Sequence, residues 1–187
     1  MLYVVRHART EANAGGRLQG RIDLPLEEVG RQQAARLTAI VPNPARLVVS
    51  PALRAAETAA VFGSPDEVDE RWHEMDYGSL EGVRVADVPA ATWAQWRSDP
   101  HFAPEGGESL AAVAARVFAA CEALAADAAD RDVVVVTHAT PVKIAMAWAL
   151  GADPSVTWRS FVDQASVTRI AFRDGRPVLQ AFNQLPG

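Results

Sequence analysis

The sequence predicts an α/β protein: a three-layer sandwich in which a mainly parallel, doubly wound sheet carries helices on both faces. Short apolar runs, rich in β-branched residues, at 2–5, 47–49 and 133–136 alternate with longer segments of helical spacing. These runs are apolar at every position, which is typical of strands that are buried on both faces. We therefore expect parallel strands joined by helical crossovers, with a short helical insertion.

The first half of the chain is expected to hold two pairs of strand and helix. The run at 2–5 ends at two basic residues, and a polar loop with glycines follows it. The spacing of apolar residues predicts a helix from 28 to 41, with Val29 on its buried face and prolines after it. A second strand is expected at 46–50, and Ser50-Pro51 predicts the capped start of the next helix.

The middle of the chain is expected to add a weakly signalled strand near Val68 and a short helical insertion over the sheet. The insertion covers about 83–104 and contains Trp93 and Trp96. Ser109 predicts the N-terminal cap of a long amphipathic helix, because apolar residues recur every three or four positions after it.

The last part of the chain contains its clearest strand, the valine run at 133–136, which leads into His138. Thr140-Pro141 predicts the next helix, with Thr140 as its cap. Asp174-Gly175 separates two further apolar runs and predicts a hairpin, because this pair suits a tight turn.

Length and composition fit a single domain over residues 1–187, with 49% hydrophobic and 22% charged residues. The net charge of −5 argues against a nucleic-acid or membrane-surface partner, because phosphate groups attract an excess of Lys and Arg. The single Cys121 has no disulfide partner, and its spacing places it in the core. Without an N-terminal leader or an apolar run of about 18 residues, we expect a cytoplasmic protein.

Basic side chains follow the ends of several predicted strands. Arg6 and His7 follow the first strand. Arg54 lies just after the second, and His138 follows the valine run. In a doubly wound sheet these junctions lie at one edge, so the four side chains can form a cationic pocket suited to a tetrahedral phosphate. Glu74, in the loop before the insertion, supplies a carboxyl group that can protonate a leaving oxygen.

The loop after the first strand reads Arg6-His7-Ala8-Arg9-Thr10-Glu11-Ala12-Asn13. Further segments of the same pattern follow in order: Gln19-Gly20, Asp23, Pro25-Leu26, Gly30, Gln33-Ala34, Ser50-Pro51, Leu53-Arg54, Thr58-Ala59, Glu74, Tyr77-Gly78, Glu81-Gly82, Gly106-Gly107-Glu108-Ser109 and His138. The chain thereby resembles the histidine phosphatase superfamily, which includes the cofactor-dependent phosphoglycerate mutases and opens with Arg-His-Gly-x-Thr-Glu-x-Asn. The resemblance runs from residue 2 to about 145 and implies a phosphoglycerate mutase-like fold.

The resemblance also implies roles for individual residues. His7 would be the nucleophile, and Glu74 the general acid and later the base. The phosphate oxygens would be held by Arg6, Arg54 and His138. Secondary phosphate contacts are implied at Asn13, Gln19 and Gly20. No metal or other cofactor is implied, since a cationic clamp can supply positioning and charge stabilisation.

Two elementary requirements follow from these roles. His7 must attack as a neutral imidazole, so its other ring nitrogen should donate to a backbone carbonyl or similar acceptor. Glu74 must be protonated in the complex with substrate, which a nearby phosphate dianion favours.

The family glycines after the two histidines are Ala8 and Ala139 here, which could alter the turn or the approach of phosphate. We expect activity to survive because every charged role is filled.

Other polar residues have less specific interpretations. Glu74 competes with Asp76 and Glu81 for the acid role, and its position four residues before a glycine selects it. His73 and His101 lack the close ligand spacing of a zinc site.

Two interpretations stay open for the tryptophans and the arginine of the insertion and for the arginines of the first loop. Trp93 and Trp96 favour packing in the core or lid over stacking on a substrate. Arg97 could reach a substrate carboxylate or be a solvated helix charge. Candidates for the rim of the pocket are Arg9, Arg17 and Arg21.

The leading functional hypothesis is a metal-independent phosphatase that hydrolyses a small phosphorylated metabolite through a phosphohistidine intermediate and releases inorganic phosphate. Phosphoglycerate mutase-type transfer is the nearest alternative. The short insertion, whose only basic residues are Arg84 and Arg97, favours hydrolysis, because mutases of the family are longer and more basic around the substrate.

Two further alternatives are a phosphohistidine protein phosphatase and a non-catalytic phosphate-binding module. The protein phosphatases tend to lack the lid-like insertion, and a non-catalytic module would lack the nucleophile or the acid. The substrate and the oligomeric state, including a homo-oligomer, are left open by the sequence.

Overall fold

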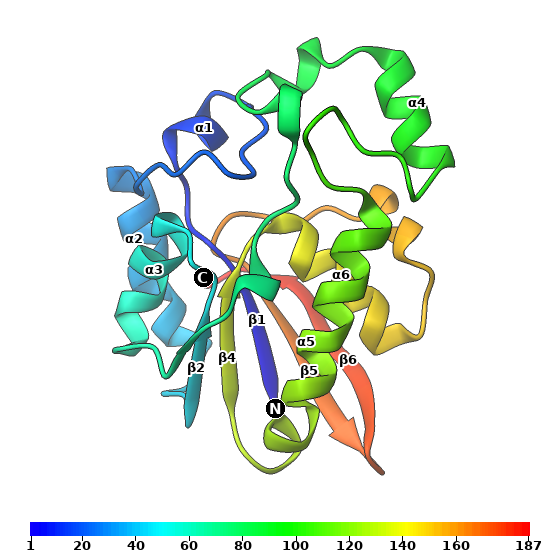
Figure 1. Cartoon of the computed structure of the whole chain (residues 1–187). Coiled ribbons are helices and arrows are strands. Elements are labelled where there is room, and N and C mark those ends of the chain that lie inside the picture. Colours follow the sequence, from blue (N-terminus) through cyan, green and yellow to red (C-terminus); the bar gives the residue numbers. More distant parts are fainter.

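The computed structural model describes residues 1–187 and contains one six-stranded sheet in the order β3-β2-β4-β1-β5-β6 (Figure 1). The strands are β1 (Leu2–Arg6), β2 (Arg46–Val49), β3 (Glu67–Val68), β4 (Val133–Thr137), β5 (Val167–Arg173) and β6 (Arg176–Gln184). The α-helices are α1 (Glu11–Ala14), α2 (Glu28–Arg36), α3 (Leu53–Ala59), α4 (Ala90–Ser98), α5 (Leu110–Asp130) and α6 (Ala139–Leu150). The four strands from β3 to β1 are parallel, and β5 and β6 add an antiparallel hairpin. The predicted mainly parallel sheet is confirmed.

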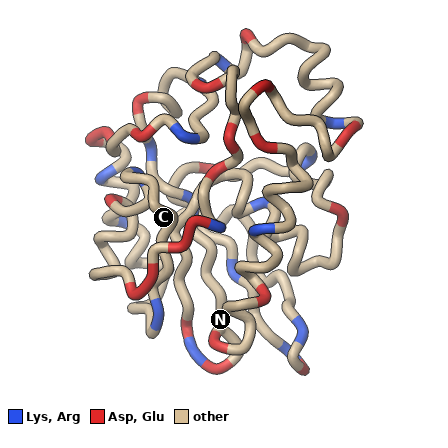
Figure 2. Tube along the Cα trace, viewed as in Figure 1, with Lys and Arg blue, Asp and Glu red and all other residues tan.

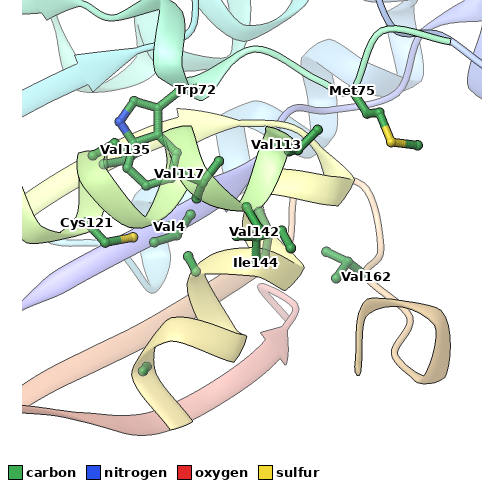
Figure 3. Close-up of a cluster of buried hydrophobic side chains, with 14 of the residues drawn as sticks. Val4, Trp72, Met75, Val113, Val117, Cys121, Val135, Val142, Ile144 and Val162 are labelled. Atoms are coloured by element: carbon green, nitrogen blue, oxygen red, sulfur yellow. The ribbon is translucent and has the colours of Figure 1, made fainter. Parts of the chain in front are cut away.

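Helices cover both faces of this sheet, and alternate residues of the central strands enter two separate cores. Val133 and Val135 of β4 pack with α5 and α6 and with Val4 of β1, as Figure 3 shows in part. Val134 and Val136 pack on the opposite face with residues of α2 and α3. The predicted three layers are therefore present, and burial on both sides explains the uninterrupted apolar runs.

The helix predicted from 28 to 41 is shorter than expected and differently rotated. α2 ends early, and a 3-10 turn covers Leu37–Ala39. Val29 is 44% exposed, so the prediction that it faces the core is wrong. Gly30 is buried instead, and a Cβ at that position would lie 2.1 Å from the carbonyl oxygen of Arg9. The close approach of two backbones therefore decides which side of α2 faces inward.

Two predicted helix caps are wrong. The N-cap of α3 is Ala52, and the hydroxyl of Ser50 contacts His138 instead. The N-cap of α6 is His138 itself, so Thr140 lies inside the first turn. The hydroxyl of Ser50 bonds to His138 across the edge of the sheet and is therefore not used as a helix cap.

Other local predictions are confirmed. Ser109 caps α5, and its side chain accepts from the amide of Ala112 at 3.2 Å. Asp174 and Gly175 have φ values of 52° and 72°, as the tight turn between β5 and β6 requires. Cys121 is buried in the core shown in Figure 3.

The insertion at 83–104 contains α4 and lies beyond the carboxyl ends of β1 and β4, above the sheet in Figure 1. Trp96 of α4 is 1% exposed, and its ring centroid lies 5.1 Å from that of Trp93 and 6.1 Å from that of Trp158. Packing, the favoured interpretation of Trp96, is confirmed, and this aromatic cluster anchors the insertion over the sheet edge.

No helix of the structure combines the length and the apolar character needed to cross a membrane.

The charged residues are not segregated on a large scale. Acidic and basic residues are mixed along the whole trace (Figure 2). In a chain of net charge −5, a strongly positive site must therefore be built locally.

Candidate active site

The two candidate catalytic histidines lie side by side because their strands are neighbours. β1 and β4 are parallel, with Arg6 opposite Thr137, and a histidine follows each strand. The amide of His7 donates to the carbonyl oxygen of Thr137 at 2.7 Å. The ring centroids of His7 and His138 are 5.1 Å apart, and both side chains are buried. The carboxyl edge of the sheet therefore holds a pair of buried imidazoles.

The ring of His7 is held in one tautomer. Its Nδ1 lies 2.8 Å from the carbonyl oxygen of Ala8. Because a carbonyl only accepts, Nδ1 carries the proton and Nε2 keeps its lone pair. Burial and the positive charges of Arg54 and Arg6 hold the pKa of His7 well below its usual range. The imidazole is neutral, and its second nitrogen donates to a carbonyl, as the sequence analysis requires of a nucleophile.

Arg54, in the first turn of α3, is a fully buried cation held by neutral groups. Its Nε donates to Nδ1 of His138 at 3.1 Å. Its two terminal nitrogens donate to three backbone carbonyls of residues 19–22, at 2.8 to 3.4 Å. The carboxylate of Asp23 is 4.0 Å away and its side chain is 54% exposed. The positive charge of Arg54 is therefore only weakly compensated by the protein.

His138 has hydrogen bonds at both ring nitrogens. Nδ1 accepts from Arg54, so the neutral ring carries its proton at Nε2. Nε2 lies 2.7 Å from the hydroxyl oxygen of Ser50, just after β2. Burial and the charge of Arg54 hold the pKa of His138 well below its usual range. Ser50 orients this histidine, a contact that the sequence analysis missed by assigning Ser50 to a helix cap.

Arg6 ends β1 with part of its guanidinium unpaired. Nη1 donates to the carbonyl oxygen of Val162 at 2.5 Å. Nε is buried and has no hydrogen-bond partner. Burial lowers the pKa of Arg6, and the negative charge of Glu74 acts against this shift. A buried donor without an acceptor suits an anion at this position.

Glu74 is the carboxylate that the fold brings to the histidine pair. It is 4% exposed, and its Oε1 accepts from the amides of Met75 at 2.8 Å and Thr140 at 3.2 Å. Thr140 lies in the first turn of α6, two residues after the second histidine. The competing carboxylates are engaged elsewhere, Asp76 with an arginine and Glu81 with backbone amides. The position of Glu74 thus supports its selection over both.

Arg116 of α5 positions the segment that carries Glu74. Its guanidinium donates to the carbonyls of Arg71 and His73, both at 2.7 Å, and to that of Glu74 at 3.2 Å. Glu108 pairs with it at 2.8 Å. Arg116 could not be found from the sequence, because the carbonyls that it binds lie 42 to 45 residues away and no local pattern marks them.

Glu81 fixes the loop that accepts the hydrogen bonds of Arg54. Its carboxylate accepts from the amides of Gly20, Arg21 and Ile22 at 3.0 to 3.2 Å. The amide of Gly20 is therefore already bound, and its carbonyl accepts from Arg54. In this structure Gly20 supports the arginine and offers no free donor to a phosphate, which differs from the role that the family resemblance implies.

Gln19 and Asn13 belong to a hydrogen-bond network of the first loop. The hydroxyl of Thr10 donates to the side-chain oxygen of Gln19 at 2.7 Å, and the Gln19 amide donates to the carbonyl of Ile22 at 3.2 Å. The side-chain oxygen of Asn13 accepts from the amide of Thr10 at 3.1 Å in the capping box of α1. Neither side chain bonds to a histidine of the site, so their phosphate contacts stay predictions.

The alanines after the two histidines need no glycine-like backbone. Positive φ outside glycine is confined to three other residues, so Ala8 and Ala139 have ordinary conformations. Ala8 is buried in the core beside α2 and α3, and its amide donates to the hydroxyl of Thr58 at 3.0 Å. The departure from the family glycine at this position is thus accommodated by packing.

The remaining polar candidates are engaged in local contacts. Arg9 is paired with Glu27, Arg17 donates to the carbonyl of Gly82 at 2.8 Å, and Arg21 lies 3.4 Å from Asp76. The rings of His73 and His138 are stacked with their centroids 6.5 Å apart, and His101 is exposed. No group of three or more His, Cys, Asp or Glu side chains is arranged to hold a metal ion.

We expect the free energy of unfolding to fall as pH decreases below about 6.5, the ordinary histidine pKa. The folded state keeps His7 and His138 neutral, whereas the unfolded chain protonates both near that pH. The unfolded state therefore binds more protons, and stability should drop by up to about 1.4 kcal/mol per pH unit for each histidine until the folded-state pKa is reached. Urea denaturation at several pH values measures this slope.

The contribution of one histidine can be isolated with matched variants. His138→Asn should reduce the slope, whereas His101→Asn should keep it, because His101 is exposed. Identical slopes for wild type and His138→Asn would contradict the assignment of a buried neutral imidazole.

A positive site at the carboxyl edge of a doubly wound sheet, with a neutral histidine beside buried arginines and a buried carboxylate, is typical of enzymes that act on phosphate esters. The model of the histidine phosphatase superfamily (branch 1) matches residues 2–185. The chain belongs to this family, so the resemblance seen in the motifs is confirmed.

Relatives across the family share both sequence and fold with this chain. Glucosyl-3-phosphoglycerate phosphatase of Mycolicibacterium vanbaalenii is 33% identical over 211 residues, covering 97% of this chain and 93% of that protein. Phosphoserine phosphatase 1 of Hydrogenobacter thermophilus is 32% identical, covering 97% of this chain and 91% of that protein. The structure of mycobacterial glucosyl-3-phosphoglycerate phosphatase with VO3 superposes with a TM-score of 0.85 at 32% identity, covering 97% of this chain and 98% of that one.

Proposed function

We propose that this protein is a metal-independent phosphatase that hydrolyses a small phosphomonoester through a phosphohistidine at His7. The observation that carries the proposal is the Nδ1 contact of His7 with the carbonyl of Ala8, which leaves Nε2 as a free nucleophile among buried cations. The related proteins named above are phosphatases, and they support hydrolysis of a phosphate monoester.

In the proposed first step, Nε2 of His7 attacks phosphorus, and the bond between phosphorus and the leaving oxygen breaks. Glu74 gives its proton to that oxygen, so the alcohol leaves neutral. Arg6 and Arg54 stabilise the charge on the phosphoryl oxygens, and His138 joins them when its Nε2–H exchanges the hydroxyl of Ser50 for a phosphoryl oxygen. The unpaired Nε of Arg6 supports this role, because it is a donor ready for a phosphate oxygen.

In the proposed second step, water attacks the phosphohistidine. Glu74, now a carboxylate, takes a proton from that water, and the bond between phosphorus and His7 breaks. The products are inorganic phosphate and neutral His7, and Glu74 is again protonated. Ser50 and Arg116 act as positioning residues, since they orient His138 and the segment of Glu74 without reaching the phosphate.

Hydrolysis is favoured over mutase-type transfer by the build of the insertion. It contains one short α-helix, and its only Lys or Arg residues are Arg84 and Arg97. We further propose that residues 1–187 act as one domain with 83–104 as a lid over the site. A cytoplasmic location and a phosphorylated metabolite as substrate belong to the same proposal.

The experiment that tests this function compares wild type with His7→Ala on a generic aryl phosphate in the presence of a chelator. Wild type should turn over, and the variant should lose at least about a thousandfold in kcat. Rapid acid-free quenching with radiolabelled substrate should trap phosphohistidine at position 7 in wild type alone. His101→Ala is the matched control, because it removes an exposed histidine. Equal turnover of wild type and His7→Ala would contradict the proposed mechanism.

A further inference from the structure

A cavity of about 450 Å³ adjoins the candidate acid and extends under the insertion. Three residues link it to the site. Thr140 and Met75 both line it and donate their amides to Glu74, and Ala139 directly follows His138. A phosphate ester whose leaving oxygen lies at Glu74 must place the rest of its alcohol somewhere beyond that oxygen. The cavity is placed to take it.

The walls of this cavity are largely aromatic and aliphatic. Its apolar lining includes Val85, Tyr77, Trp93, Trp96, Trp158 and Phe161. Two of these side chains, Val85 and Phe161, are 45% and 69% exposed, so a ligand in the cavity can cover them. These walls suit a leaving group with an aromatic or bulky apolar body.

The polar groups of the cavity are mainly donors. Two cations line it, Lys143 and Arg97, and no Asp or Glu does. Arg97 lies 5.8 Å from the ring centroid of Trp93, above the same wall. In a chain of net charge −5, this local excess of donors and positive charge suits an anionic acceptor.

Of the two cations that line the cavity, Lys143, the single lysine of the chain, is the nearer in sequence to His138. It lies one helical turn after Ala139 on α6. Its Nζ donates only to the carbonyl of Thr157 at 3.3 Å, which leaves two of its three N–H groups free. Burial lowers the pKa of Lys143, and the charge of Glu74 opposes this shift. A carboxylate on the substrate would supply the missing acceptor.

We propose that the cavity selects phosphomonoesters whose alcohol combines an aromatic or bulky apolar body with a carboxylate, and that Lys143 binds this carboxylate. The inference rests on the proposed phosphatase function and adds its substrate class. The phosphate ester bond breaks as described above, and the carboxylate takes no part in the chemistry. Lys143 is therefore a specificity residue for the leaving group.

The test uses two esters of the same shape, the aryl phosphate of 3-(4-hydroxyphenyl)propanoate and its primary amide. Wild type should prefer the carboxylate by about tenfold or more in kcat/KM, since a charge-assisted hydrogen bond is lost with the amide. Phosphoserine is an alkyl ester and is expected to react more slowly for chemical reasons alone, so only a rate above that of the aryl carboxylate bears on the cavity. Lys143→Met should bring the ratio of carboxylate to amide to within about twofold, and Lys143→Arg should retain most of it.

The matched control is Arg176→Met, which removes an exposed cation at the hairpin on the opposite end of the sheet (Figure 1) and should keep the wild-type ratio. Thermal melting verifies that each variant is folded. The inference is overturned by a wild-type ratio near one, by a ratio that survives in Lys143→Met, or by faster hydrolysis of phosphoserine. These outcomes differ from failure of the proposed function, in which no ester is hydrolysed and no phosphohistidine forms.

Discussion

Replacing Arg54 by Met should lower kcat/KM for any phosphomonoester by about a thousandfold, because the site loses a preorganised cation beside the reacting phosphoryl group. The same change leaves carbonyls of residues 19–22 and Nδ1 of His138 without their donor. The free energy of unfolding should therefore fall by about 2–4 kcal/mol. Steady-state kinetics and urea denaturation on the same preparation measure the two effects.

Two further variants separate charge from fold in this experiment. Arg54→Lys keeps the charge but loses the planar fork, so it should fall between wild type and Arg54→Met. Arg46→Met removes an arginine at the far end of β2 that is paired with Glu67 and Asp127, and it should retain activity despite losing these bonds. A folded Arg54→Met protein within tenfold of wild-type kcat/KM would refute a role for this residue at the phosphate.

Glu74→Gln should slow alkyl phosphate hydrolysis by about a hundredfold to ten-thousandfold, since an alkoxide leaves poorly without a proton donor. Gln can still accept from the amides of Met75 and Thr140, so the fold should persist. With 4-nitrophenyl phosphate, whose leaving group needs no proton, the first step should remain. Because the base for the second step is absent, phosphohistidine should accumulate.

The distinguishing readout is a burst of nitrophenol equal to the enzyme concentration, followed by slow turnover. Glu28→Gln, at an exposed carboxylate on α2, is the matched control and should behave as wild type. If Glu74→Gln slows alkyl and nitrophenyl esters by the same factor and shows no burst, Glu74 is not the acid and base.

The central strands and their histidines could be predicted because burial on both faces leaves a strong local signal. Uninterrupted apolar runs mark β1 and β4, and each strand carries a histidine to the same edge. The parallel register then brings His7 and His138 together without further information. Asp174-Gly175 and Ser109 were equally predictable, because turn and cap geometry depends on adjacent residues.

The support of the site could not be predicted, because it depends on contacts between distant segments. Glu81 holds the amide of Gly20 across 61 residues, and Arg116 holds backbone carbonyls across more than forty. Ser50 was misassigned because a serine before a helix looks like a cap, whereas the actual partner lies 88 residues away. Side chains that bind backbone atoms of distant segments leave no local pattern of residue types.

The prediction of which side of α2 faces the core was wrong for a related reason. Helical spacing ranks residues by apolarity, so it placed Val29 inward. The structure places Gly30 there, because the backbone at Arg9 approaches too closely for any side chain. The catalytic roles of the site residues stay predictions until the variants above are measured.

The weak compensation of Arg54 has a kinetic consequence. At rest the site holds the charges of Arg54 and Arg6, with Glu74 as the buried carboxylate among them and Asp23 at 4.0 Å on the exposed side. Free inorganic phosphate carries the same charged oxygens as the substrate. It has no alcohol group that would favour its dissociation from the site. The product should therefore dissociate slowly and compete with substrate, and added salt should speed its escape by screening the clamp. Turnover under substrate saturation would then be limited by release, and the enzyme would respond to the phosphate level around it.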